Sequence, residues 1–352
     1  MRTPPAFFPL LAAAAISSTA CGSSGDSPAD TDAEVSTDAE VSTDGTSTAD
    51  AGETDGGACD EAAAFDEAAL RAQVEFLASP EMAGRAPGTP GDTQARTHIQ
   101  DRFACLGLQP PPGADYSQPF TDSEGDDTGN VIAVLPGSDP DLAEEIVVIG
   151  AHHDHLGQDD TGIFAGANDD ASGITVLLAV AQALSERPVA PRRTVVFAAF
   201  GAEEVDLCGS QWYVDHPPAG LPIEKTVFMI QLDMLGTYGQ GQQLYALDAL
   251  PETVARTAVE SVMGDFPELN VTLDEPGDSS DQVNFCAKGV PDLFFFTEDP
   301  ECYHKTCDVP SHLDYPHMAQ TAQLVTATVE ALADGGLDLT AAGAAGCVPP
   351  TE

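Results

Sequence analysis

Three apolar runs in the middle of the chain each lead directly into a group of histidine or acidic residues. The runs are IVVI (146–149), TVVFAAF (194–200) and TVFMIQ (226–231), and they precede GAHHDH, GAEE and LDM. Runs that are apolar on both faces are typical of interior strands covered by helices on each side. Because functional groups in open α/β sheets gather just beyond the carboxyl ends of such strands, we expect these polar groups to lie at one edge of a sheet.

The flanking segments predict helices that alternate with strands. Residues 61–108 carry apolar side chains at helical spacing and are interrupted by a Gly/Pro turn over 84–91. Further β-rich runs occupy 131–135 and 293–296, and a helix is expected over about 173–184. This alternation predicts the α/β class, as a three-layer α/β/α sandwich.

The balance of charge limits the partners of the chain. Its 352 residues include 58 Asp and Glu against 12 Lys and Arg, which gives a net charge of −46. Such a charge argues against nucleic acid and against an anionic membrane face as partners. We interpret most of it as a solvated surface, and the length favours one α/β body with an appended tail.

The N-terminus is typical of an export signal. Arg2 precedes an apolar run over 7–16 that is too short to span a bilayer, so residues 1–20 are predicted to be a signal peptide. Ser-Thr-Ala-Cys at 18–21 resembles a bacterial lipoprotein processing site, although Ser18 stands where such sites usually carry Leu. We expect a lipid on Cys21 and a place at the cell envelope, on the outer membrane or cell surface, with simple cleavage and secretion as the alternative.

Residues 21–60 are predicted to form a disordered acidic tether behind that lipid. The segment contains no Lys or Arg, and the unit TDAEVS occurs at 31–36 and again at 37–42. A segment of this composition cannot bury enough apolar surface to fold. The folded domain is expected over residues 61–345.

Eight cysteines in an exported chain favour disulfide bonds. Cys59 and Cys347 flank the domain and are candidates to join its ends. Cys302 and Cys307 bracket His304 and are candidates for a small loop. The sequence leaves the connectivity open.

The GAHHDH group contains a candidate metal ligand. Side chains two residues apart in a strand point to the same side, so Asp154 can hold the outer nitrogen of a metal-bound His152. A single histidine near a strand end is more often structural. We interpret His153 and His155 as structural residues or pocket lining.

The loop GANDDASG supplies a second candidate group. Asp170 or Ser172 suits the N-cap of the helix expected from about Gly173, which is the simplest interpretation of these polar residues. A loop carboxylate also has two oxygens with which to bridge two metal ions. Both interpretations can hold together.

The adjacent Glu203 and Glu204 follow a seven-residue apolar run. Carboxylates buried side by side repel each other and lose hydration unless cations or protons are present. A metal ion resolves this conflict, because one Glu can bind it while the other moves a proton of the attacking water. A solvated acidic turn is the alternative, and it fits poorly after so apolar a strand.

Asp233 closes another apolar run, and His304 lies in CYHKTCD before a helix expected to begin near His312. Each of the two alone suits a cap or a surface position. With the other groups they give two histidines and three carboxylates without a thiolate. That mixture favours a catalytic zinc pair over a structural zinc site.

These motifs resemble those of the secreted bacterial dizinc aminopeptidases, whose relatives include glutamate carboxypeptidase and the glutaminyl cyclases. The resemblance covers about residues 65–335 and rests on GAHHDH, GANDDASG, AFGAEE, QLDMLG and YHKTCD in the expected order. The segment LASPEMAGRAPGTPG, with Arg85, is similar to the opening segment of the family. The resemblance implies a zinc-exopeptidase-like fold around a mixed, mostly parallel sheet.

The resemblance further implies that two Zn²⁺ ions are bound by five residues: His152, Asp169, Glu204, Asp233 and His304. Asp169 would bridge the ions, with His152 and Asp233 completing one site and Glu204 and His304 the other. The peptide bond between Asp169 and Asp170 would be cis.

Three further residues receive catalytic roles from the resemblance. Glu203 would be the general base, and Asp154 would orient His152. Tyr303 would stabilise the tetrahedral intermediate. One position departs from the family, because Ser280-Asp281-Gln282 stands where Ser-Asp-His is common, and Gln282 cannot carry a proton.

The leading hypothesis for function is hydrolysis of a peptide bond near a chain end. Acidic surroundings attract a free α-amino group, which favours an aminopeptidase over a carboxypeptidase or dipeptidase on the same site. A glutaminyl cyclase-like acyltransferase with a single zinc is a second hypothesis, although such relatives tend to carry Trp where this chain has Tyr303. A binding module without catalysis is a third, and it fits poorly because the ligands and the base are all present.

Overall fold

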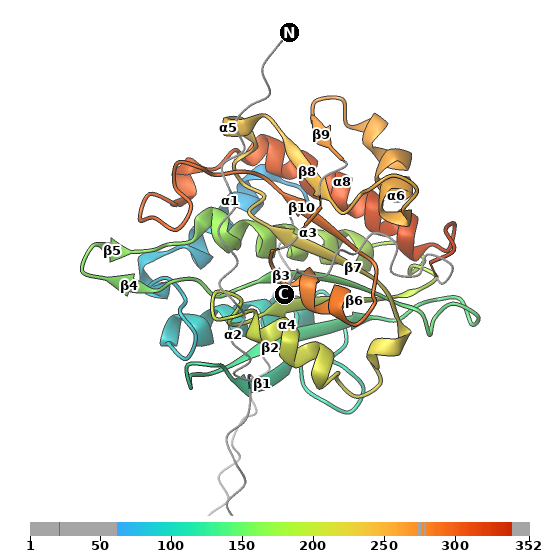
Figure 1. Cartoon of the computed structure of the whole chain (residues 1–352), viewed down its shortest axis with the longest axis horizontal. Coiled ribbons are helices and arrows are strands. Elements are labelled where there is room, and N and C mark those ends of the chain that lie inside the picture. Colours follow the sequence, from blue (N-terminus) through green and yellow to red (C-terminus); the bar gives the residue numbers. More distant parts are fainter. Residues whose placement is uncertain (1–20, 22–61, 274–275, 278, 340–352) are drawn as a thin grey trace, which may run out of the picture.

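An eight-stranded sheet forms the centre of the protein (Figure 1). The computed structural model describes Cys21 and residues 62–273, 276–277 and 279–339. The strands of this sheet are β1 (Ser117–Thr121), β2 (Asp127–Leu135), β3 (Ile146–His152), β6 (Thr194–Phe200), β7 (Thr226–Asp233), β8 (Leu244–Leu247), β9 (Val271–Thr272) and β10 (Asp292–Phe296). A separate hairpin, β4 (Gln158–Asp159) with β5 (Gly162–Ile163), projects from the body at the left of Figure 1.

Helices lie on either side of the sheet. The α-helices are α1 (Glu67–Leu77), α2 (Pro90–Cys105), α3 (Gly173–Ser185), α4 (Cys208–Asp215), α5 (Tyr238–Gly241), α6 (Val254–Val262), α7 (Gln282–Ala287) and α8 (Tyr315–Ala333). Short helical turns are η1 (Pro80–Met82), η2 (Ala167–Ser172), η3 (Ile223–Lys225), η4 (Met263–Asp265) and η5 (Pro310–His312). Among the described residues, no helix is long and apolar enough to cross a membrane.

The strand order β1-β2-β6-β3-β7-β10-β8-β9 brings the predicted site residues together. β3 lies between β6 and β7 and is parallel to both, and β10 is parallel to β7. β2 is antiparallel to β1 and β6, and β8 is antiparallel to β10. The carboxyl ends of β6, β3, β7 and β10 therefore lie next to one another, as the sequence predicted.

Alternate side chains of the central strands enter two separate cores. Ile149 is in register with Phe197 on one neighbour and Ile230 on the other, and all three pack in the core that contains residues of α1, α2, α3 and α8. Val148, one residue earlier, packs in the opposite core with residues such as Tyr213 of α4 and Phe285 of α7. The predictions of a three-layer α/β/α sandwich and of a mixed, mostly parallel sheet are confirmed.

Capping side chains set the first helices where the sequence predicted them. The Asp66 carboxylate accepts hydrogen bonds from the Ala68 and Ala69 amides at the start of α1. Thr89 caps α2, and Pro90 occupies its first turn, where a missing N–H costs nothing. The edge strands β1, β8 and β9 were not predicted, because they are short and only partly buried.

The described cysteines are all in disulfide bonds. Cys302 pairs with Cys307, as the sequence suggested. Cys21 pairs with Cys208, which differs from the predicted lipid attachment, because a sulfur in a disulfide is not available for a thioether. The candidate pair Cys59–Cys347, the signal peptide and the tether beyond Cys21 lie outside the described residues.

Candidate metal centre

His152, at the end of β3, is the centre of the first group of ligands. Its Nε2 atom lies 3.2 Å from Asp169 Oδ1 and 3.5 Å from Asp233 Oδ1. Asp233 is the last residue of the neighbouring strand β7, and Asp169 lies in η2 just before α3. The parallel pairing of β3 with β7 thus brings His152 beside Asp233, and η2 adds the second carboxylate.

The second group of ligands uses the other oxygen of Asp169. His304 Nε2 lies 3.2 Å from Asp169 Oδ2 and 3.2 Å from Glu204 Oε2. Glu204 follows β6, and His304 lies in the loop after β10. Asp169 therefore has one oxygen in each group, which is the arrangement expected of a residue that bridges two metal ions.

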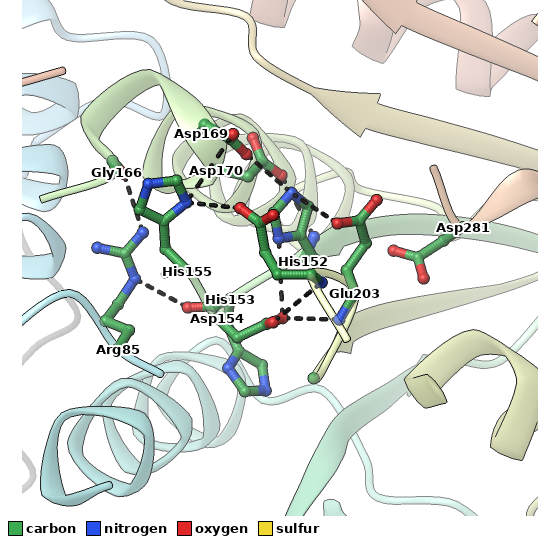
Figure 2. Close-up of polar contacts among 12 residues, drawn as sticks. Arg85, His152, His153, Asp154, His155, Gly166, Asp169, Asp170, Glu203 and Asp281 are labelled. Carbon is green, nitrogen blue, oxygen red and sulfur yellow. Dashed lines mark hydrogen bonds and ion pairs between the residues drawn. The ribbon is translucent and has the colours of Figure 1, made fainter. Parts of the chain in front are cut away.

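Asp154 holds the two glutamates beside His152. Its carboxylate accepts hydrogen bonds from the backbone amides of Glu203, at 3.1 Å, and Glu204, at 3.2 Å. The same carboxylate lies 3.7 Å from His152 Nδ1, on the side away from the ligand nitrogen. Asp154 thus fixes the segment after β6 against the end of β3 (Figure 2), in addition to the orienting role that the sequence predicted.

Asp170 joins three segments of the site through backbone amides. Its carboxylate accepts hydrogen bonds from the amides of His152, Gly173 and Met234. The bond to Gly173 is the predicted cap of α3, and the cis peptide bond between Asp169 and Asp170 is confirmed. Burial raises the pKa of Asp170 well above its ordinary value, and the nearby Asp233 adds to this rise.

The loop of the last histidine is tied to the loop of the bridging aspartate. Asp308, four residues after His304, accepts hydrogen bonds from the amides of Asn168 (2.7 Å) and Asp169 (3.1 Å). Burial raises the pKa of Asp308 to about 6, against the effect of these two bonds. Asp308 therefore helps to set the position of Asp169 relative to His304.

Arg85 connects the segments behind the ligands and is fully buried. Its Nε donates to the His153 carbonyl (2.8 Å), Nη1 to those of Leu77 and Ala165 (2.7 Å each), and Nη2 to that of Gly166 (2.9 Å). Figure 2 shows Arg85 beside His155 and Gly166, away from Glu203 and Asp281. One guanidinium thus ties the end of β3 to the loop that leads to Asp169.

The carboxylates of the site outnumber its cationic groups, and their charges shift the pKa values of the site residues. Burial lowers the pKa of His152, but the charges of Glu203 and Asp233 outweigh it and hold this pKa well above its ordinary value. Burial also opposes protonation of His304, whereas Asp169 and Glu204 raise its pKa to about 10. Burial, Asp233 and Glu204 raise the pKa of Glu203 despite the opposing charge of His152. Without a metal ion, bound protons reduce the repulsion among these acidic groups.

The donor atoms of the two groups fit zinc. Ligand atoms of His152, Asp169 and Asp233 lie within 4.8 Å of one another, and their imidazole and carboxylate donors are those of catalytic zinc sites. The buried Asp233 Oδ1 has no hydrogen-bond partner among the described residues, although it points at His152. His304 is the most exposed of the five proposed ligands, with 34% of its side chain accessible, so the site opens to solvent on that side.

Tyr303 lies beside the second group of ligands. Its ring stacks on the His304 ring, with the centroids 3.9 Å apart. Burial raises the pKa of the Tyr303 hydroxyl, and the charges of Asp169 and Glu204 raise it further. The hydroxyl therefore stays protonated as a hydrogen-bond donor near the ligands.

His155 and Asp281 were not predicted as site residues. His155 Nδ1 lies 2.7 Å from Glu204 Oε1, whereas the sequence predicts a structural or pocket-lining residue at this position. Asp281 is buried beside Glu203 (Figure 2), and burial raises its pKa to about 7. Only the motif Ser280-Asp281-Gln282 signalled this carboxylate. His153 is structural as expected, because its Nε2 contacts the Gly129 carbonyl.

Comparison with known proteins agrees with this geometry. Residues 130–329 match the pattern of Peptidase family M28, which is more than half of the chain. The chain belongs to peptidase family M28. The matched residues include all five proposed ligands, and the match stops within α8.

One curated protein and two solved structures illustrate the similarity. Aminopeptidase YwaD of Bacillus subtilis is 34% identical over 197 residues, which cover 53% of this chain and 40% of that protein. The structure of the Bacillus subtilis zinc aminopeptidase BSAP has a TM-score of 0.63 and 19% identity, and the match covers 78% of this chain and 97% of BSAP. The structure of Porphyromonas gingivalis glutaminyl cyclase has a TM-score of 0.63 and 18% identity, and the match covers 76% of this chain and 99% of the cyclase.

The chain matches only part of the length of its curated relatives. The matches cover 40%, 60% and 39% of the lengths of the first three curated relatives. The two solved structures, at less than 25% identity, support the zinc-exopeptidase-like fold that the sequence predicted.

The titration of the histidines predicts proton release on metal binding. Zinc binds neutral imidazole, whereas the raised pKa values of His152 and His304 keep both protonated at pH 7 in the metal-free protein. Zinc uptake at pH 7 is expected to release at least two protons, because the acid Glu203, whose pKa is also raised, can add to those of the two histidines, and the apparent affinity is expected to rise with pH. Calorimetric titration in buffers of different ionisation enthalpy measures this number, and uptake without proton release would contradict it.

The contacts of Arg85 predict that it is needed for metal affinity as well as for stability. Arg85→Lys keeps the charge but loses the fork that binds four carbonyls, so zinc affinity is expected to fall by roughly ten- to a hundredfold. The matched control is Arg193→Lys. Arg193 is also buried and donates to the Glu145 carboxylate and to the Leu332 and Leu337 carbonyls, but it lies just before β6, away from the ligands.

Both variants are expected to lose thermal stability in the metal-free form, because each leaves buried carbonyls with fewer donors. Zinc affinity, measured by competition with a chelator, should fall in Arg85→Lys alone. Equal losses of affinity in the two variants would show that Arg85 acts only through general stability.

Proposed function

We propose that this M28 chain is an aminopeptidase that binds two zinc ions and hydrolyses the N-terminal peptide bond of peptides. The observation that carries the proposal is the position of Asp169, whose two oxygens lie 3.2 Å from His152 Nε2 and 3.2 Å from His304 Nε2. A bridging carboxylate between two imidazole and carboxylate groups fits hydrolysis by a metal-activated water. The relative from Bacillus subtilis carries the name of an aminopeptidase.

Two zinc ions bound here would polarise the scissile carbonyl and make water more acidic. Glu203 has Oε2 at 3.9 Å from His152 Nε2, so it lies beside the ligands. Its carboxylate removes a proton from the attacking water and returns it to the leaving amine as the carbon–nitrogen bond breaks. The Tyr303 hydroxyl donates a hydrogen bond to the oxygen of the tetrahedral intermediate.

The acidic character of the site supports a substrate with a free α-amino group. Asp281 and Glu203 lie together in the site (Figure 2). Neither is one of the five proposed zinc ligands, so their carboxyl groups are additional to those that bind metal. In their ionised form these two acids attract an ammonium group, and the ammonium group in turn favours that form. A substrate carboxylate would be repelled, which favours an aminopeptidase over a carboxypeptidase.

We infer that the chain is exported. The Cys302–Cys307 and Cys21–Cys208 disulfides support this, because disulfides persist in oxidising compartments outside the cytosol. Attachment of a lipid to Cys21 and the disulfide to Cys208 exclude each other. The disulfide supports a secreted or envelope protein that retains Cys21 without a lipid on its sulfur.

The two adjacent glutamates provide the test of function. Glu203→Gln keeps all five ligands, so it should keep two zinc ions per chain while kcat falls by roughly a hundred- to ten-thousandfold or more. Glu204→Gln should lose metal from the second group. The measurements are zinc per chain by atomic emission and kcat on aminoacyl-nitroanilides.

Glu203→Gln with reduced zinc and Glu204→Gln with full zinc would reverse the assignment. Full activity of both variants would exclude the site. One zinc per chain in the wild type, with release of ammonia from an N-terminal glutamine, would favour a glutaminyl cyclase.

The fate of Cys21 is tested by mass spectrometry of the purified mature chain. We expect a non-reducing digest to contain a peptide that joins Cys21 to Cys208, because the structure pairs their sulfurs. An acyl-modified Cys21, together with a free thiol on Cys208, would contradict this expectation and restore the lipid anchor.

A further inference from the structure

His155 makes a hydrogen bond to a proposed zinc ligand without being one of the five. It lies three residues after His152 and is fully buried. Its Nδ1 is 2.7 Å from Glu204 Oε1, and because a carboxylate only accepts, this nitrogen is the donor. The other carboxylate oxygen, Glu204 Oε2, lies 3.2 Å from His304 Nε2.

We propose that His155 is a positioning residue for the second zinc ion, a role that rests on the two-metal function proposed above. By holding one oxygen of Glu204, it directs the other oxygen to the position shared with Asp169 and His304. A metal-binding carboxylate that is hydrogen-bonded from outside loses less freedom when the ion binds.

The ring of His155 is fixed in this orientation. Gly166 packs against it so closely that a Cβ atom there would lie 2.6 Å from His155 Cγ. The His155 amide donates to the Arg85 carbonyl at 3.4 Å, and the His304 ring meets its ring edge-on at 5.8 Å between centroids. A ring held by these neighbours cannot turn away from Glu204.

Glu204 depends on this contact. Within the described part of the chain, the hydrogen bonds and ion pairs of its carboxylate go to His155 and His304. His304 is partly exposed, whereas His155 is buried. His155 is therefore the fixed point from which the Glu204 carboxylate is oriented.

Ligand atoms of His155, Asp169 and Glu204 also lie within 4.8 Å of one another, so a direct ligand is the alternative role for His155. His155 Nδ1 lies 3.8 Å from Asp169 Oδ2, compared with 3.2 Å for His304 Nε2, and it is already bonded to Glu204. Its Nε2 atom is buried and has no hydrogen-bond partner among the described residues. His304 supplies the imidazole of the second group, and His155 orients the carboxylate.

Two substitutions distinguish the nitrogen atoms of His155. The amide nitrogen of Asn reaches about the position of histidine Nδ1, and that of Gln the position of Nε2. His155→Gln is expected to keep the first zinc and to bind the second roughly ten- to a hundredfold more weakly, whereas His155→Asn should restore affinity to within a few-fold of wild type.

The matched control is His153→Gln. His153 belongs to the same motif and is also buried, but its Nε2 contacts the Gly129 carbonyl at 3.1 Å and its Nδ1 lies 3.6 Å from Asp92. This variant should bind both zinc ions as the wild type does. Zinc affinity is measured by titrating the second equivalent against a chelator, and the absorption spectrum of the cobalt-substituted proteins reports the geometry of the site.

Several results would overturn the role of His155. They are unchanged binding of the second zinc in His155→Gln, equal weakening in His155→Asn, or failure of both variants to fold. X-ray absorption that counts three imidazoles for two zinc ions would make His155 a ligand instead. A wild type that binds one zinc or lacks peptidase activity would refute the proposed function itself, before any variant is compared.

Discussion

Mutual repulsion among buried carboxylates is the constraint on which this site depends. Asp169, Glu203, Glu204 and Asp233 converge on two histidines at one edge of the sheet, where water is largely excluded. Such a group is stable only with compensating positive charge. Protons on His152 and His304 supply it in the metal-free protein, and zinc ions would replace those protons.

The scaffold meets this constraint by supporting the acids through backbone groups. Asp154, Asp170 and Asp308 accept hydrogen bonds from amides of the segments that carry the ligands. Each bond stabilises a carboxylate and at the same time fixes a loop. The ligand positions therefore depend on residues that do not themselves bind metal.

The sequence predicted the central strands, and it singled out the five candidate ligands that the structure brings together, because motifs at the ends of apolar runs are local signals. An apolar run that ends in His152 or Glu204 shows both the strand and the group at its end. His155 lies in the same motif as His152, but its contact with Glu204, forty-nine positions further along the chain, gave no local signal. The Cys21–Cys208 disulfide was missed for the same reason, with a sequence separation of 187. Contacts of this kind become visible only when the fold brings the segments together.

The placement of Arg85 shows how positive charge and metal affinity are kept compatible. A guanidinium paired with Asp169 would compete with zinc for its oxygens. Arg85 instead gives its hydrogen bonds to four carbonyls, so its charge lies behind the site without occupying a ligand. The net charge of −46 acts differently, because exposed charges are screened over about 8 Å at physiological ionic strength. Metal affinity is therefore set by the few buried groups around Asp169, and not by the acidic surface.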